Sequence, residues 1–246
     1  MDTSNLLKTN QFKGRRCFII GGGPSVQGLD FSLIENDVTI GINKAFMYYP
    51  KCTINYAMDM SWYTFLTTPT KDPDQLRAQE AWKAYKGYKT WVSLSAFKTT
   101  PPKGIQVIKK IKEQNLSLNL EHGIFGGNNS GWGAINIALA LGCNPVYLLG
   151  YDMKMSNNKT HWHEGYAKTR PQGLDRRLEK FGNMIAKFAD VISEMGFQVI
   201  NLNPDSGLTC FPKMEFNKLF ERVGNVDSRL FGQETIGEDN SKQLSN

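Results

Sequence analysis

The segment RCFIIGGGPS, residues 16–25, decides the fold class of this chain. It begins as a short apolar strand and stops at three consecutive glycines, a proline and a serine. Glycines at a strand end allow a sharp turn and let a ligand approach the backbone, and the N–H groups of such a turn form an anion site. The pattern is not G-x-G-x-x-G, and it is not a P-loop because no Gly-Lys-Ser/Thr follows. We predict that the turn holds a phosphate-bearing ligand through Gly21, Gly22, Gly23, Pro24 and Ser25; the alternative is a tight turn that binds nothing.

The composition indicates a globular chain with a packed core. It has 246 residues, of which 40% are hydrophobic and 21% are charged, and we expect one domain over residues 1–223 and a polar tail over 224–246. No apolar stretch is long enough to span a bilayer, and the N-terminus lacks the apolar core of a signal peptide. Because the four cysteines are scattered without a C-x-x-C pair, we expect reduced thiols and a cytoplasmic location.

The formal net charge of +6 does not by itself identify a partner. Many of the lysines lie between residues 83 and 112, a distribution typical of a solvated surface as well as of an anion-binding face. No RNP motif, zinc finger or helix-turn-helix is present. The sequence therefore favours a small-molecule ligand over nucleic acid, and it leaves the oligomeric state, including a homo-oligomer, open.

Short apolar segments alternate with segments of helical spacing along the chain. Strands are predicted at residues 16–20, 38–43, 53–59, 89–94, 145–150 and 197–202, with helices at 62–88, 129–141 and 174–195. The stretch 96–122 shows no clear pattern. This order predicts an α/β fold with a mainly parallel sheet and helices on both faces.

Polar residues follow several of the predicted strands. In parallel sheets a ligand binds beyond the carboxyl ends of the strands, where this chain has Asn43, Asp59, Asp152 and Ser206 in addition to the glycine turn. Asp59 and Asp152 are able to bind a divalent cation or a sugar hydroxyl, and Asp152 is counted among the catalytic candidates. Neither belongs to an Asp-x-Asp pair, so the sequence predicts no metal site and leaves a metal requirement open.

A second glycine-rich stretch, GGNNSGWG at residues 126–133, precedes the predicted helix 129–141. At a helix N-terminus, backbone N–H groups and a serine hydroxyl bind phosphate or ribose. Asn129, Ser130 and Gly131 are therefore predicted nucleotide contacts, with a plain helix cap as the alternative.

Two of the three histidines lie close together in the loop that follows Asp152. His161 and His163 have no third histidine or nearby cysteine that would complete a zinc site. Imidazole titrates near neutral pH, so general acid–base catalysis is the functional hypothesis. Packing against Trp162 that merely orders the loop is the structural alternative.

In this order, the segments resemble bacterial sialyltransferases of the Campylobacter lipooligosaccharide type and the related MptE-like and motility-accessory-factor proteins. The resemblance runs in islands between Cys17 and Phe211: IGGGPS (20–25), GINKAF (41–46), NSG (129–131) with VYLLGYD (146–152), and NPDS (203–206). The histidine segment reads HWHE instead of the family's Gly-His-Ser. The family's pair of tyrosines that neutralise the leaving phosphate has no clear match, with Tyr151 and Tyr166 as candidates.

The resemblance implies that His161 or His163 activates an acceptor hydroxyl, while Gly22, Asn43, Ser130 and Ser206 surround a cytidine nucleotide. The leading hypothesis is therefore a glycosyltransferase with a Rossmann-like, GT-A-type variant of the α/β fold. It moves a sugar from a CMP- or UDP-linked donor to a hydroxyl acceptor. One alternative is an MptE-like pyrophosphokinase that uses ATP and Mg²⁺ to act on 6-hydroxymethylpterin. Another is a non-catalytic nucleotide-binding protein of a phage or mobile element.

Overall fold

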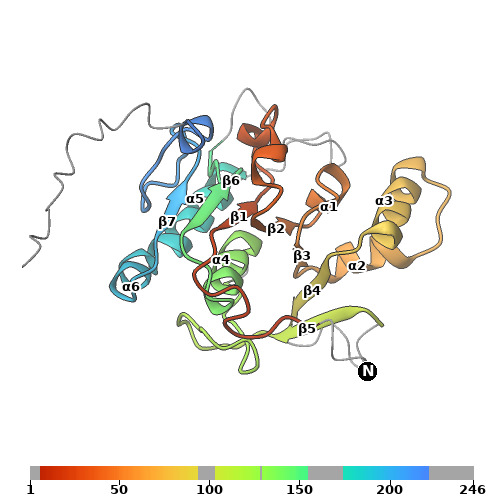
Figure 1. The fold of residues 1–246 in the computed structure, drawn as a ribbon. Coiled ribbons are helices and arrows are strands. Elements are labelled where there is room, and N and C mark those ends of the chain that lie inside the picture. The colour runs from red at the N-terminus through yellow and green to blue at the C-terminus, as the bar shows by residue number, and fades with distance from the viewer. Residues whose placement is uncertain (1–5, 94–102, 128, 155–173, 222–246) are drawn as a thin grey trace, which may run out of the picture.

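The computed structural model describes residues 6–93, 103–127, 129–154 and 174–221. Figure 1 shows a central sheet with helices packed against it. The strands are β1 (Cys17–Ile20), β2 (Val38–Ile42), β3 (Ile54–Ala57), β4 (Tyr88–Ser93), β5 (Ile105–Lys109), β6 (Val146–Leu149) and β7 (Val199–Asn201). The helices are α1 (Ala45–Tyr48), α2 (Met60–Thr67), α3 (Pro73–Ala84), α4 (Ser130–Ala140), α5 (Leu174–Ala186) and α6 (Ala189–Glu194).

The sheet has the strand order β5-β4-β3-β2-β1-β6-β7. Every neighbouring pair is parallel, which confirms the predicted α/β class. The chain builds outward from β1 to β5 and then returns to place β6 on the other side of β1. The order therefore reverses between β1 and β6, and such a reversal creates the crevice in which open parallel sheets bind ligands.

Helices cover both faces of the sheet, as the sequence predicted. Alternate side chains of a strand point to opposite faces: Cys17 and Ile19 belong to one buried cluster, whereas Phe18 and Ile20 belong to the other. Helix α4 and the residues of α5 and α6 pack in the first cluster, while α1, α2 and α3 pack in the second. The fold thus has three layers.

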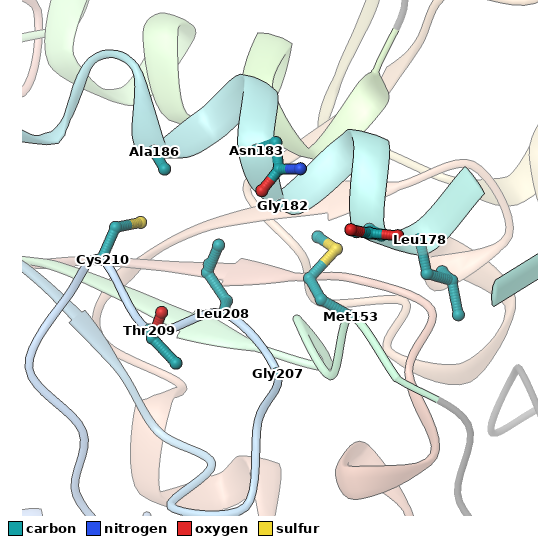
Figure 2. Close-up of a pocket in the computed structure, with 10 residues that line it drawn as sticks. Met153, Leu178, Gly182, Asn183, Ala186, Gly207, Leu208, Thr209 and Cys210 are labelled. Atoms are coloured by element: carbon teal, nitrogen blue, oxygen red, sulfur yellow. The ribbon is translucent and has the colours of Figure 1, made fainter. Parts of the chain in front are cut away.

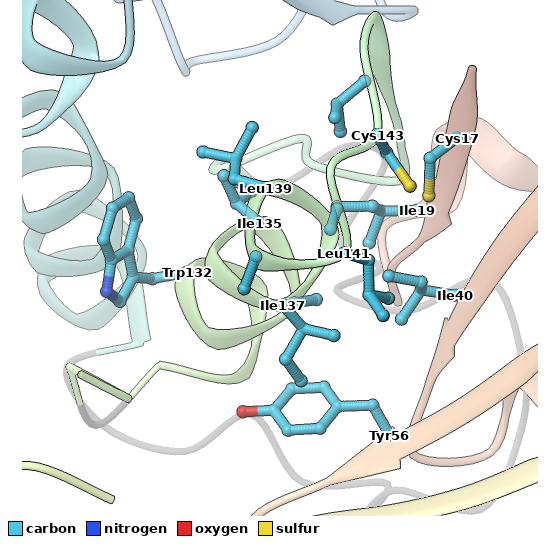
Figure 3. Close-up of a cluster of buried hydrophobic side chains, with 14 of the residues drawn as sticks. Cys17, Ile19, Ile40, Tyr56, Trp132, Ile135, Ile137, Leu139, Leu141 and Cys143 are labelled. Carbon is cyan, nitrogen blue, oxygen red and sulfur yellow. The ribbon is translucent and has the colours of Figure 1, made fainter. Parts of the chain in front are cut away.

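Helix α4 is buried on nearly all sides because it lies in the middle of its layer. Residues 132–140 are all buried, as expected for a helix that is enclosed by other elements. Figure 3 shows Ile135, Ile137 and Leu139 of α4 among side chains of β1, β2 and β3. This packing holds the start of α4 in a defined place beside the sheet.

Three expectations about the elements are corrected. The helix predicted over 174–195 is two helices, because the backbone N–H of Phe188 bonds to Ile185 in a tighter turn (3.1 Å). That break lets the Phe188 ring stack on Trp132 with centroids 4.1 Å apart. The stretch 96–122, which showed no pattern, contains the edge strand β5, and the prolines at 69 and 73 divide the region 62–88 into α2 and α3 before β4.

Two further sequence expectations concern thiols and membranes. Cys17, Cys52 and Cys143 are buried free thiols, and Cys210 is a half-buried one. Within the described ranges, no helix has the length and apolar character needed to cross a membrane. The predicted tail, 224–246, lies outside the described residues.

Candidate functional site

Asp152 joins the ends of three strands at the carboxyl edge of the sheet. Its carboxylate accepts hydrogen bonds from the backbone N–H of Ser25 (3.0 Å), the Ser25 hydroxyl and the Asn203 side-chain amide (2.9 Å). Its own carbonyl accepts a bond from the N–H of Gly207 (2.7 Å). Asp152 is 5% exposed, so the segments after β1, β6 and β7 are held together by one buried carboxylate.

The glycines after β1 are explained by close packing on the end of β6. A Cβ atom at Gly23 would lie 2.5 Å from Asp152 Cγ and 2.6 Å from the Gly150 carbonyl, and one at Gly21 would lie 2.9 Å from the same carbonyl. Gly150 itself has a φ of 69°, in the left-handed region where glycine is favoured. Larger residues would therefore push β1 and β6 apart.

Three N–H groups of this turn donate to acceptors within the protein. Gly21 donates to Leu149 (2.8 Å), Gly23 donates to Gly150 (2.9 Å) and Ser25 donates to Asp152. The turn continues into a three-residue 3-10 turn, Pro24–Val26, instead of an α-helix. In this conformation the three N–H groups hold the protein together and are not available to a phosphate.

The start of α4 is capped by Asn129, the plain helix cap that the sequence offered as the alternative to a nucleotide contact. The Asn129 side chain accepts bonds from the N–H groups of Gly131 (2.8 Å) and Trp132 (3.4 Å), and its amide donates to the Phe181 carbonyl of α5 (3.3 Å). The hydroxyl of Tyr151 donates to the Gly131 carbonyl (2.8 Å), and burial raises its pKa well above the ordinary value. Tyr151 thus ties β6 to α4, and this contact occupies the hydroxyl that was a candidate for the leaving phosphate.

Ser206 and Asp59, two further predicted contacts, differ in their surroundings. Ser206 is buried, and its hydroxyl donates to the Tyr151 carbonyl (2.5 Å) and accepts from the Leu208 N–H (2.9 Å). Asp59 is exposed at the start of α2 and makes no capping bond there. Gly22, Pro24 and Ser130 are half-buried.

Asn43 combines a left-handed backbone with a buried side-chain oxygen at the end of β2. It follows β2 with a φ of 53°, a left-handed backbone that asparagine tolerates better than most residues. The Asn55 amide bonds to its carbonyl (3.1 Å), which fixes the backbone. The Oδ1 atom of Asn43 is buried and has no hydrogen-bond partner among the described residues.

Strands β3 and β4 contain three more buried oxygens without a hydrogen-bond partner in the described part of the chain. They are Asn55 Oδ1, Tyr56 Oη and Thr90 Oγ1. Sequence analysis missed Asn55 and Thr90, although a polar residue inside the apolar segments TINYA and YKTWV was a usable signal. Because unpaired buried polar groups are rare, each one requires an explanation such as a bound ligand or water.

A pocket of 160 Å³ lies beside this edge, between α5 and the segment after β7 (Figure 2). Its lining combines apolar and polar side chains: Met153, Leu178, Glu179, Gly182, Asn183, Ala186, Gly207, Leu208, Thr209 and Cys210. Met153 directly follows Asp152 and has a φ of 47°, which is uncommon for a long side chain. Burial raises the pKa of Cys210 to about 11, which keeps it a thiol at neutral pH.

The predicted catalytic histidines cannot be added to this geometry. His161, His163 and Tyr166 lie outside the described residues. Within the described part of the chain, no group of three or more His, Cys, Asp or Glu side chains is arranged to hold a metal ion. The predicted site therefore consists, in the structure, of its strand-end residues and the capped start of α4.

No protein-family model matches the sequence. No curated protein matches it either. Among solved structures, the chain is similar to the sialyltransferase CstII from Campylobacter jejuni in complex with CMP-3FNeuAc, with 17% identity and a TM-score of 0.49 over 81% of this chain and 86% of that chain. It is also similar to CST-II in complex with a trisaccharide acceptor and CMP, with 16% identity and a TM-score of 0.48 over the same shares. Similarity at this level assigns neither a family nor an activity to the chain.

Proposed function

We propose that this protein is a glycosyltransferase that uses a nucleotide-linked sugar. The nucleotide is proposed to bind beyond the carboxyl ends of β1 and β2 and at the start of α4. The observation that carries the proposal is the buried Oδ1 of Asn43, which has no hydrogen-bond partner among the described residues and lies at the carboxyl edge of a parallel sheet. A carbonyl oxygen of this kind accepts a hydrogen bond from an amine or a hydroxyl. Nucleotides offer both, as the exocyclic amine of a base and the hydroxyls of ribose.

A ligand that donates hydrogen bonds here would satisfy buried oxygens that have no partner among the described residues. A buried acceptor without a partner costs about 1–3 kcal/mol, and Asn43 and Asn55 each have one such oxygen. The resemblance of the sequence to sialyltransferases supports a cytidine nucleotide in this position. A UDP-linked donor has the same ribose hydroxyls and is the closest alternative.

In the proposed reaction, His161 or His163 accepts the proton of an acceptor hydroxyl. The oxygen then forms a bond to the anomeric carbon of the donor sugar while the bond from that carbon to the phosphate oxygen breaks. The nucleotide leaves with the electron pair of the broken bond, and the proton remains on the histidine. This assignment rests on the position of the two histidines in the sequence after Asp152 and on the suitability of imidazole as a base near neutral pH.

The proposed role of Asp152 is positioning, because both of its carboxylate oxygens already accept hydrogen bonds from Ser25 and Asn203. Ser206 is bonded to the backbone of the same region. We retain as proposed nucleotide contacts the predicted residues that follow β1 or begin α4, namely Gly22, Pro24, Ser130 and Gly131. Asp59, which follows the carboxyl end of β3, is retained as a proposed contact to sugar hydroxyls.

A thermal-shift panel tests the proposal directly. We expect CMP or UDP to raise the melting temperature without Mg²⁺, by about 5 °C or more at a hundredfold excess over Kd. Stabilisation by ATP only with Mg²⁺ would favour the pyrophosphokinase alternative instead. The absence of a shift with CMP, UDP, GDP and ATP would exclude both enzymes.

The role of the histidines has a separate test. His161→Ala and His163→Ala should each keep the CMP or UDP shift, because neither side chain is proposed to hold the nucleotide. One of them should abolish sugar transfer to a hydroxyl acceptor or hydrolysis of the donor. Full activity of both variants would show that neither histidine is the base.

A further inference from the structure

The pocket beside α5 is separate from the proposed nucleotide contacts but adjoins them. Met153 and Gly207 in its lining directly follow Asp152 and Ser206 in the chain. The helix on its other side is fixed by the bond from the Asn129 amide to Phe181, the residue before Gly182. The pocket therefore has a defined position next to the carboxyl edge of the sheet.

Gly182 keeps this pocket open although the helix does not need a glycine there. Glycine is a poor residue for a helix interior, and Gly182 lies in the middle of α5. A Cβ atom at this position would lie 3.9 Å from Leu208 Cδ1 and 4.0 Å from Met153 Cβ, which is ordinary contact. At Gly133 in α4, by contrast, a Cβ atom would lie 2.1 Å from the Tyr56 hydroxyl, so packing there demands glycine.

Met153, at the same pocket, has an unfavourable backbone conformation. Its left-handed backbone, with a φ of 47°, is rare for a residue with a long side chain. Figure 2 shows its side chain extending between the α5 side and the segment after β7. Strained backbone of this kind is concentrated at binding and catalytic sites.

The lining of the pocket indicates the chemistry of its ligand. Glu179, Asn183 and Thr209 supply a carboxylate, an amide and a hydroxyl, while Leu178, Leu208 and Met153 supply apolar surface. The carboxylate disfavours an anionic ligand, and the mixture suits a neutral ring with hydroxyls at its edge and C–H groups on its faces. The volume of 160 Å³ is below the roughly 300–1,000 Å³ of pockets for drug-sized ligands, so its size fits a single ring better than a nucleotide.

We propose that this pocket binds a neutral sugar ring of the hydroxyl acceptor. The inference rests on the proposed function for its place in a reaction, but the pocket can be tested without turnover. Gly182 is then a specificity-determining residue, because a larger side chain at this position would extend into the space proposed for the ring.

The test uses saturation-transfer NMR with three neutral probes: methyl β-D-galactopyranoside, methyl β-D-glucopyranoside and methyl α-D-mannopyranoside. At least one should bind the unaltered protein. Gly182→Leu, which fills the pocket, should weaken that binding on the order of tenfold or more, and Gly182→Ala should weaken it less. Lys180→Leu is the matched control, because Lys180 is exposed on the same helix and does not line the pocket.

Nucleotide binding is measured on the same samples by the thermal shift. If Gly182→Leu keeps the nucleotide shift and loses the sugar signal, the inference is supported. If no probe binds, or if Gly182→Leu binds as well as Lys180→Leu, the inference is wrong, whatever the nucleotides do. If the sugar result is as expected but no nucleotide binds, the pocket stands and the proposed function fails.

Discussion

Two sides of the same sheet edge treat their polar groups in opposite ways. After β1, β6 and β7, the side chains of Ser25, Asp152 and Asn203 are joined by hydrogen bonds. In and after β2, β3 and β4, buried oxygens of Asn43, Asn55 and Thr90 have no partner in the described part of the chain. Both sides are polar in sequence, but within the described part of the chain the hydrogen bonds of the first side are made and those of the second are not.

This difference separates structure from binding. Hydrogen bonds that are already made stabilise the turn after β1 and leave little for a ligand to gain. An unpaired buried acceptor, in contrast, destabilises the free protein and increases the affinity for a ligand that donates a hydrogen bond to it. We therefore expect substitutions on the first side to reduce stability and substitutions on the second side to reduce binding.

The largest effect should come from Asp152→Ala, which breaks the completed side. The change leaves the Ser25 and Asn203 donors unpaired, and bonds to charged groups contribute about 1.5–3 kcal/mol each. We expect a loss of about 3 kcal/mol or more in the free energy of unfolding, measured by urea denaturation. Asp205→Ala is the control, because Asp205 is exposed; equal stability of the two variants would contradict the role of Asp152.

A smaller loss is expected for Gly23→Ala. The new methyl group would lie 2.6 Å from the backbone carbonyl of Gly150, and overpacking of this kind costs about 1–3 kcal/mol. The melting temperature should fall by roughly 2–4 °C per kcal/mol in a chain of this size. Gly182→Ala, which has room for its methyl group, should instead raise the melting temperature; a fall in both would mean that the close contact is not the cause.

On the open side, Asn43→Gly should change binding and not folding. Glycine accepts the left-handed backbone and removes the unpaired acceptor, so stability should stay within about 1 kcal/mol. Nucleotide affinity, measured by calorimetry, should fall about tenfold, equivalent to roughly 1.4 kcal/mol. The matched control is Asn10→Gly, at an exposed asparagine with a φ of 60°; unchanged affinity in Asn43→Gly would remove the main support for the proposed site.

The smallest effect is expected for Thr90→Val in β4. Valine has nearly the shape of threonine and removes a buried hydroxyl that has no partner among the described residues. Stability should therefore be unchanged or higher by about 0.5 kcal/mol. A loss of more than about 1 kcal/mol in denaturant unfolding would show that water or another group satisfies this hydroxyl in the free protein.

Much of the fold followed from local pattern. Apolar segments ending at glycine or a polar residue predicted six of the strands. Asn129 or Ser130 before an apolar run predicted a helix cap, and the structure places that cap on Asn129. The break before α6 was missed, because it is a local tightening of the turn at Phe188 inside a continuous helical pattern, and the Phe188 ring there stacks on Trp132, 56 positions away in the numbering. The edge strand β5 was missed as well, since only three of its five residues are apolar.

The candidate site was predicted in outline and corrected in its chemistry. Parallel strands bring their carboxyl ends to one edge, so Asn43, Asp152 and Ser206 were correctly placed beyond the strands that they follow. The sequence contained no sign that Gly21 and Gly23 are needed for packing on β6, or that their N–H groups are already bonded. The nucleotide-binding and catalytic roles themselves stay predictions.

The sequence by itself determined a parallel α/β sheet and the polar residues that follow its strands, because apolar periodicity and turn residues act over a few neighbours. Only the tertiary structure decided which polar groups are satisfied. Ser25 and Asp152 are 127 positions apart in the chain, and they meet because β6 lies beside β1 in the sheet. That strand order completes one side of the edge with hydrogen bonds and leaves Asn43 on the other side with an acceptor for a ligand.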